Sequence, residues 1–218
     1  MNGRLGNESE DIVPYPKVLD CFREGTEMGL LTIRGIACGE NHTLALIDVD
    51  VGQIDEKPDC GSDEPNPDQQ NESLEHSSTK MTRLFVWGSN EKKQLGLSLD
   101  LFDDVATDEA NSNNDRSGHA SSNAGSQDVK VPHQLDPCPF ECNDDGQVPV
   151  KIVAGYNYSG AVTADGVIYT WGNGNFGRLG YTDILKQPVP RQVHELKSFK
   201  ISKLALGYYH AAAINQEG

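Results

Sequence analysis

The chain has 218 residues, of which 36 % are hydrophobic, and it carries a formal net charge of −15. Residues 48–80 hold ten acidic and two basic residues, and residues 100–130 hold seven acidic and two basic residues. Most of the negative charge therefore belongs to two segments, and the remainder of the chain is close to neutral. Because the chain has no basic stripe that could hold a phosphate backbone, we expect no direct binding to nucleic acid.

The start of the chain lacks the apolar run of a signal peptide, and no stretch of about 18 apolar residues could span a bilayer. Among five irregularly spaced cysteines, Cys138 and Cys142 lie four positions apart, but no second Cys or His pair near them would complete a zinc site. We therefore expect reduced thiols, no metal, no cofactor and no membrane partner. The expected compartment is the cytoplasm or the nucleus.

Three segments share one glycine-rich pattern. Residues 2–6 read NGRLG, residues 84–96 read LFVWGSNEKKQLG, and residues 167–180 read VIYTWGNGNFGRLG. Each of the two longer copies begins with a short apolar strand that ends in a Trp-Gly pair, at Trp87 and at Trp171. Both then reach a leucine, Leu95 or Leu179, followed by glycine. A pattern that recurs along the chain indicates a repeat architecture.

A second shared pattern follows each of the glycine-rich segments. It reads IACGENHTLAL at residues 36–46, IVAGYNYSGAV at residues 152–162 and LALGYYHAAAI at residues 204–214. The turn glycine is Gly39, Gly155 or Gly207, and two copies share a histidine, His42 and His210. Each copy predicts a strand, a turn and a second strand, and residues 164–166 (ADG) predict a hairpin turn before the next strand. The chain is therefore expected to be all-β, with repeated antiparallel sheets.

The spacing between the two patterns reveals two insertions. Gly155 lies 16 residues before Trp171, whereas Gly39 lies 48 residues before Trp87. The extra residues fall in the acidic segments 48–80 and 100–130, whose composition cannot bury enough apolar surface to offset chain entropy. We interpret both as disordered loops, either plain spacers or interaction segments for basic partners. In the second case Ser62 and Thr107, each followed by Asp-Glu, are candidate kinase sites.

Together, the pattern W-G-x-G-x-x-G-x-L-G and the following G-x-x-H-x-x-A-L resemble the regulator of chromosome condensation repeat. The resemblance implies a seven-bladed β-propeller of four-stranded blades, of which this chain holds about two and a half repeats. We expect an incomplete arc, and hence a fragment, an incomplete gene model or a part of an assembly, because an open arc cannot close alone. The expected segments are 1–47 (first repeat), 48–80 (insertion), 81–99 (start of the second repeat), 100–130 (insertion), 131–170 (rest of the second repeat) and 171–218 (third repeat). Residues 89–93 (SNEKK) depart from the family pattern, which places two glycines there, so this turn must be built differently.

Gly172, Gly174 and Gly177 form a G-x-G-x-x-G motif directly after a strand, as in dinucleotide-binding proteins. That use of the motif requires a helix beginning at the third glycine, whose free N–H groups hold the pyrophosphate. Here Pro188 and Pro190 follow closely, and the loop recurs as a repeat element. We therefore interpret the glycines as residues for tight turns and not as a nucleotide site.

The remaining repeated residues are interpreted as structural. They are Trp87, Trp171, Gly39, Gly155, Gly207, His42, His210, Leu95 and Leu179. Because a catalytic group is normally unique and no acid–base or nucleophilic constellation stands out, we expect no catalytic residue and classify the chain as a non-enzyme.

The leading hypothesis is a propeller scaffold that binds a protein partner, and the resemblance makes a small GTPase the first candidate. One alternative is guanine-nucleotide exchange on a Ran-type GTPase with chromatin association. Another is a targeting domain of a larger ubiquitin ligase or kinase. By loop position alone, Asn175, Phe176 and Arg178 are expected to be exposed and to contact the partner.

Overall fold

A computed structural model of the chain describes residues 3–8, 13–50, 80–97, 128–135, 140 and 148–218. One short helix, α1 (Asp20–Glu27), precedes the strands β1 (Leu31–Cys38), β2 (His42–Asp50), β3 (Lys80–Gly88), β4 (Val129–Gln134), β5 (Pro149–Ala154), β6 (Tyr158–Thr163), β7 (Ile168–Gly172), β8 (Gln187–Gln192), β9 (Ile201–Leu206) and β10 (Ala211–Asn215). Two short 3₁₀ helices, η3 (Asn175–Gly177) and η4 (His194–Leu196), lie in the loops on either side of β8.

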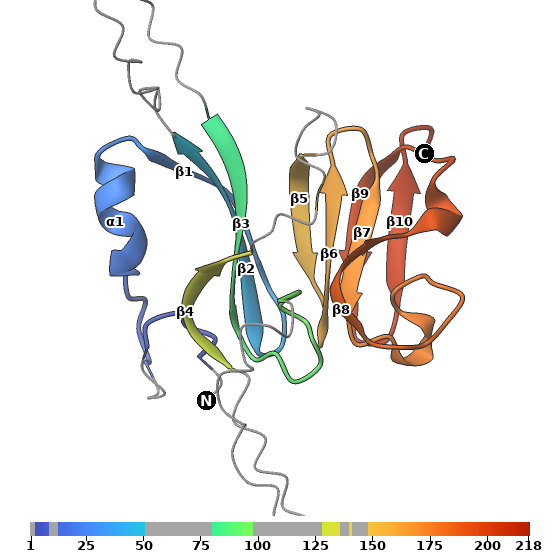
Figure 1. The fold of residues 1–218 in the computed structure, drawn as a ribbon, viewed down its shortest axis with the longest axis horizontal. Coiled ribbons are helices and arrows are strands. Elements are labelled where there is room, and N and C mark those ends of the chain that lie inside the picture. Colours follow the sequence, from blue (N-terminus) through green and yellow to red (C-terminus); the bar gives the residue numbers. More distant parts are fainter. Residues whose placement is uncertain (1–2, 9–12, 51–79, 98–127, 136–139, 141–147) are drawn as a thin grey trace, which may run out of the picture.

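The strands form three antiparallel sheets that stand side by side (Figure 1). The strand order is β1-β2-β3-β4 in the first sheet and β5-β6-β7-β8 in the second, and β9 pairs with β10 in the third. The inner strands of neighbouring sheets touch, because β1 contacts β5 and β5 contacts β9. The predicted four-stranded antiparallel blades are therefore confirmed, and the arrangement is an incomplete propeller arc.

Each blade combines two successive sequence repeats. In the first blade, β1 and β2 come from the end of one repeat, whereas β3 and β4 come from the next. At the edges of the two predicted insertions, Asp48 to Asp50 extend β2 and Val129 begins β4. Asp48 is held in the sheet by the Arg34 guanidinium at 2.9 Å and by the Thr82 hydroxyl at 2.8 Å. Almost all the other residues of the two predicted insertions lie outside the described residues. Their disorder therefore stays a prediction.

Cores form between the blades and not within a single sheet. The largest buried cluster joins Leu44, Leu84, Val86, Leu95 and Leu97 with Tyr169 and Trp171 of the second blade. A second cluster joins Tyr158, Val162, Ile168, Leu179 and Val193 with Ile201 of the third sheet. Leu95 and Leu179 come from the glycine-rich loops that follow β3 and β7, and both are buried in these clusters.

The turn predicted at residues 164–166 is confirmed. The Gly166 N–H donates to the Thr163 carbonyl at 3.0 Å, and Gly166 has φ of +87°, which glycine adopts at low cost. Helix α1 was not predicted. Its Phe22 packs edge-on against Phe85 of β3, with ring centroids 5.4 Å apart, so the helix covers the outside of the first blade.

Candidate protein-binding surface

Both tryptophans bind the glycine-rich loop of the preceding repeat. The Trp87 indole N–H donates to the Arg4 carbonyl at 3.0 Å, and the Trp171 indole N–H donates to the Gln94 carbonyl at 2.9 Å. Trp171 is fully buried, and the bond spans 77 sequence positions. These bonds connect each loop to the blade that follows it.

The turn glycines Gly39, Gly155 and Gly207 each lie against the ring three residues later. A β-carbon on Gly39 would lie 2.2 Å from His42 Cε1, and one on Gly155 would lie 2.3 Å from Tyr158 Cε1. In all three copies the glycine N–H donates to the carbonyl of that third residue, at 2.8–2.9 Å. The close approach of ring and backbone explains why glycine stands at this position.

His42 and His210 share a repeat position but have different surroundings. His42 is buried, and its Nε2 lies 2.9 Å from the Ser159 hydroxyl of the next blade. Since the Ser159 hydroxyl donates to the Gln94 carbonyl at 2.7 Å, it accepts from His42, which places the proton on Nε2. Burial lowers the pKa of His42 to about 4. His210 is exposed, and its carbonyl accepts from the Tyr158 hydroxyl at 2.6 Å.

The G-x-G-x-x-G segment forms a folded turn. The three-residue η3 spans Asn175–Gly177, and no longer helix begins at Gly177. A β-carbon on Gly174 would lie 2.0 Å from the Leu185 carbonyl oxygen, so the loop at residues 182–186 closes over the glycines. The backbone is therefore not arranged as a pyrophosphate-binding helix start.

Arg178 is buried, contrary to the prediction that it is exposed. Only 3 % of the residue is accessible, because its Nε donates to the Asn175 carbonyl at 2.8 Å and its Nη1 donates to the Tyr208 carbonyl at 3.0 Å. The guanidinium also lies 5.0 Å from the Tyr209 ring centroid and 5.7 Å from that of Phe176. Arg178 thus positions the loop and the aromatic rings around it.

Phe176 and three tyrosines gather beside Arg178. Tyr156 stacks on Tyr208 with ring centroids 3.7 Å apart, Tyr208 meets Tyr209 edge-on at 4.2 Å, and Tyr209 meets Phe176 at 4.9 Å. We name these four residues the aromatic surface. Phe176 is 75 % exposed, Tyr209 52 % and Tyr208 45 %. Asn175 is also exposed at its edge.

Phe176 adopts an unfavourable backbone conformation. Its φ is +64°, a left-handed value that costs a bulky residue energy. The neighbouring Tyr156 side chain raises the pKa of Tyr208, and Tyr208 in turn raises the pKa of Tyr209. Both phenols therefore keep their protons at neutral pH and present a ring together with a hydroxyl group. The sequence analysis did not predict that these tyrosines form a surface. The one sequence feature that points to them is that Tyr156 and Tyr208 occupy the same repeat position, where the first copy has Glu40.

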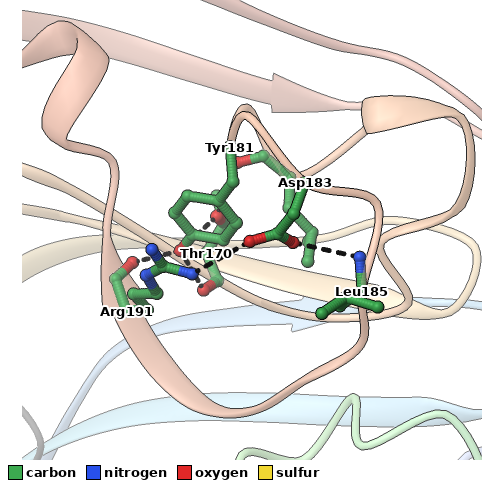
Figure 2. A network of polar contacts seen from close by, with 6 residues as sticks. Thr170, Tyr181, Asp183, Leu185 and Arg191 are labelled. Carbon is green, nitrogen blue, oxygen red and sulfur yellow. Dashed lines mark hydrogen bonds and ion pairs between the residues drawn. The ribbon is translucent and has the colours of Figure 1, made fainter.

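The segment that leaves the glycine-rich loop is fixed by a polar network (Figure 2). The Tyr181 hydroxyl lies 2.8 Å from the Thr170 carbonyl and 2.5 Å from the Arg191 carbonyl, and it accepts from the Thr170 hydroxyl. Burial raises the pKa of Tyr181 to about 12. Asp183 accepts from the Leu185 N–H at 3.0 Å and pairs with Arg191 at 3.4 Å. The network braces the segment that packs behind Gly174.

Within the described ranges, no group of three or more His, Cys, Asp and Glu side chains could hold a metal ion. Cys138 and Cys142 lie outside those ranges, as do Ser62 and Thr107. None of the described helices is both long and apolar enough to cross a membrane.

Comparison with known proteins agrees with this architecture. Residues 165–214 match the model of the Regulator of chromosome condensation (RCC1) repeat. The human E3 ubiquitin-protein ligase HERC2 is 41 % identical over 68 residues, which are 31 % of this chain and 1 % of that protein. The Ultraviolet-B receptor UVR8 of Arabidopsis thaliana is 26 % identical over 99 % of this chain and 33 % of its own length.

Among solved structures, Prp20p from Saccharomyces cerevisiae superposes with a TM-score of 0.55 at 17 % identity, covering all of this chain and 39 % of that one. The chain spans a third or less of the length of the two curated relatives described above. The repeat match, the sheet topology and this superposition agree on one architecture. Residues 165–214 match an RCC1 repeat, and the chain forms an RCC1-like partial propeller.

Proposed function

We propose that the chain is a protein-interaction scaffold and that the aromatic surface contacts the partner. The observation that carries the proposal is the exposure of Phe176, Tyr208 and Tyr209 in one continuous cluster, which two neighbouring loops form. Aromatic residues that remain exposed on a rigid framework are enriched among the residues that dominate binding energy at interfaces. Propeller loops suit this role because the sheets hold them in fixed positions.

The rigidity of the surface supports the proposal. Arg178 fixes the Asn175 and Tyr208 backbones by two charge-assisted hydrogen bonds, and the Tyr181 network holds the segment behind them. Because these bonds already restrict the backbone, the two loops lose less conformational freedom on association, which lowers the entropic cost of binding.

A small GTPase is the first partner to test. Prp20p, which shares the fold, was solved in a study of its binding to Gsp1p and histones. We extend a GTPase partner to this chain as part of the proposal. The ligase activity named for HERC2 is not extended, because the similarity covers 1 % of that protein.

The test measures binding of the purified 218-residue chain to a panel of small GTPases, each in its GDP-bound, GTP-bound and nucleotide-free form. The double variant Phe176→Ala/Tyr208→Ala removes two exposed rings and is expected to weaken binding by at least about tenfold. Ile36→Ala is the matched control, because Ile36 is 64 % exposed but lies on the inner strand β1. Equal binding by the double variant and the wild type would refute the surface assignment.

The same panel separates binding from nucleotide exchange. Release of labelled GDP is followed at micromolar concentrations of the chain. Accelerated release from one GTPase, lost in the double variant, would establish exchange through this surface. Binding without acceleration would leave the scaffold function and remove exchange, provided that circular dichroism shows a folded β protein.

A further inference from the structure

Three residues at one repeat position form a row across three neighbouring blades. Glu40, Tyr156 and Tyr208 each follow the turn glycine of their own copy. The Glu40 N–H donates to the Tyr156 carbonyl at 3.3 Å, and the Tyr156 N–H donates to the Gly207 carbonyl at 3.4 Å. These main-chain bonds link the three turns and keep a carboxylate beside two tyrosine rings. Tyr156 belongs to the middle sheet, so both of the blades that flank it are described.

A shallow groove of about 300 Å³ lies along this row. Its lining includes Glu40, Tyr156, Tyr208 and Cys38. Tyr208 covers one face of the Tyr156 ring, with ring centroids 3.7 Å apart and ring planes inclined by 25°. The opposite face of the Tyr156 ring is therefore directed toward the blade that carries Glu40. A carboxylate and an aromatic face thus meet at one groove.

The charges around the groove favour a cation. Glu40 is exposed, and no hydrogen bond or ion pair from any described residue reaches its carboxylate. The Arg4 guanidinium donates instead to the Glu40 carbonyl at 3.3 Å and to the Asn41 amide oxygen at 3.1 Å. The pKa of Tyr208 is raised first by the neighbouring Tyr156 side chain and also by the charge of Glu40, which agrees with a carboxylate near the phenol. Because an aromatic face itself attracts cations, ring and carboxylate act in the same direction.

Arginine fits this arrangement better than lysine does. Its planar guanidinium can stack on the open face of Tyr156 while its fork of N–H donors binds a carboxylate through two hydrogen bonds. A lysine ammonium group supplies a point charge without a plane that could stack. The net charge of −15 also draws a basic partner toward the chain.

We propose that the groove between Glu40 and Tyr156 binds an arginine side chain of the protein partner. The arginine pairs with the Glu40 carboxylate and stacks on the Tyr156 ring, while the other exposed rings contact the residues around it. This inference rests on the proposed function, because it assigns a chemical class to the segment that meets the aromatic surface. It does not require the partner to be a GTPase.

Three short synthetic peptides test the chemistry of the groove. Each alternates glycine with a second residue, which is arginine, its uncharged isostere citrulline, or lysine. Isothermal titration calorimetry measures their binding to the 218-residue chain. The arginine peptide is expected to bind at least about tenfold more tightly than the citrulline peptide and about threefold more tightly than the lysine peptide. Equal affinity of the arginine and citrulline peptides, or no binding by either, would overturn the proposal, and equal affinity of the lysine peptide would overturn the choice of arginine.

A pair of charge variants separates the groove from a general attraction to the acidic chain. Glu40→Gln is expected to weaken binding of the arginine peptide about three- to tenfold, because it removes the carboxylate and keeps the size of the side chain. Glu195→Gln is the matched control: Glu195 is also exposed, but it lies in η4, at the opposite end of β9 from the turn at Gly207. Each variant removes one negative charge, so equal losses would refute a specific site.

A pair of tyrosine variants tests the stacking. Tyr156→Leu removes the aromatic face but keeps an apolar side chain, and it is expected to weaken binding of the arginine peptide about threefold or more. Tyr15→Leu is the control, because Tyr15 is 67 % exposed and precedes α1, away from the groove lining. A folded Tyr156→Leu chain that binds as tightly as the wild type would contradict the role of the ring.

Cys38 provides a local readout, because its exposed thiol belongs to the groove lining. Mass spectrometry follows alkylation by iodoacetamide at Cys38 and at Cys21, which is exposed on α1. The arginine peptide is expected to slow the reaction of Cys38 at least about threefold and to leave that of Cys21 unchanged. Equal effects on both thiols would contradict the assigned groove.

The GTPase panel distinguishes this inference from the proposed function. Each GTPase whose binding falls in the double variant Phe176→Ala/Tyr208→Ala is measured again with Glu40→Gln and Glu195→Gln. A loss of about threefold or more that is confined to Glu40→Gln would support the arginine site. Unchanged binding by Glu40→Gln would overturn the arginine site and leave the aromatic surface standing, whereas equal binding by the double variant counts against the surface itself.

Discussion

His42 Nε2 lies 2.9 Å from the Ser159 hydroxyl, a buried contact between two blades whose residues are 117 positions apart in the sequence. Through the Ser159 hydroxyl the contact continues to the Gln94 carbonyl, which also accepts from Trp171. One histidine, one serine and one tryptophan thus share a junction between blades. Because burial of His42 disfavours its charged form, the junction depends on pH.

The pH dependence of stability follows from His42. Burial lowers its pKa from 6.5 to about 4, so between these values the unfolded chain binds a proton that the folded chain excludes. Stability therefore rises with pH in this window: the contribution is fully present above pH 6.5 and about 3 kcal/mol is lost by pH 4. Urea unfolding at closely spaced pH values measures this. His42→Gln, which keeps a donor but does not titrate, should lose that slope; an unchanged slope would contradict the assignment.

The turn glycine Gly39 should tolerate no side chain. A β-carbon there would lie 2.2 Å from His42 Cε1 and 2.5 Å from the Gly155 carbonyl oxygen, so Gly39→Ala is expected to cost at least about 2 kcal/mol. Gly35 is the matched control, because its β-carbon would meet nothing within 4 Å and its φ is not positive. Gly35→Ala should be neutral or stabilising by up to about 1 kcal/mol. Similar losses in both variants would refute the steric explanation.

Lys93 stands where the other two copies have glycine. Its φ is +64°, against +64° for Gly3 and +71° for Gly177. Lys93→Gly is expected to raise the free energy of unfolding by about 0.5–1 kcal/mol, because the left-handed backbone no longer strains a side chain. The reverse change, Gly177→Ala, should lower it by about 1 kcal/mol, since only the backbone conformation opposes it. Denaturant titration of both variants checks the sign, and destabilisation by Lys93→Gly would contradict this account.

Arg178 should be needed for the form of the aromatic surface. Arg178→Lys cannot reproduce both hydrogen bonds to the Asn175 and Tyr208 carbonyls, and the expected loss is about 1–3 kcal/mol with faster amide exchange at residues 174–178. Arg191→Lys is the control: its ion pair with Asp183 is partly exposed, and the expected change is below about 1 kcal/mol. Equal effects would show that Arg178 does not organise the loop.

Much of the fold was predictable from the repeat. The recurring Trp-Gly pair marks the end of the third strand in both complete blades, and the turn glycines mark each hairpin of the first two strands. The register follows because residues at equal repeat positions must meet equal partners. The departure at residues 89–93 was also visible. The structure shows how that turn is built: the buried Asn90 side chain accepts from the Leu95 N–H at 3.1 Å, and Lys93 adopts the left-handed backbone.

The candidate surface was only partly predictable. Phe176 and Asn175 are exposed as expected, but the burial of Arg178 depends on the Tyr208 carbonyl, which lies 30 residues further along the chain. The stacking of Tyr156 on Tyr208 likewise depends on how far neighbouring blades rotate. Helix α1 contains Gly25 and Thr26, which are poor helix formers, and its packing on Phe85 has no local sequence signal.

The most direct measurement of the central claim is hydrogen–deuterium exchange of the chain with and without a GTPase that binds it in the panel. The account predicts slower exchange on binding at residues 175–178 and 207–210, which carry the aromatic surface, and little change on the inner strands β1 and β5. Slower exchange confined to β1 and β5, with residues 175–178 and 207–210 unaffected, would contradict it.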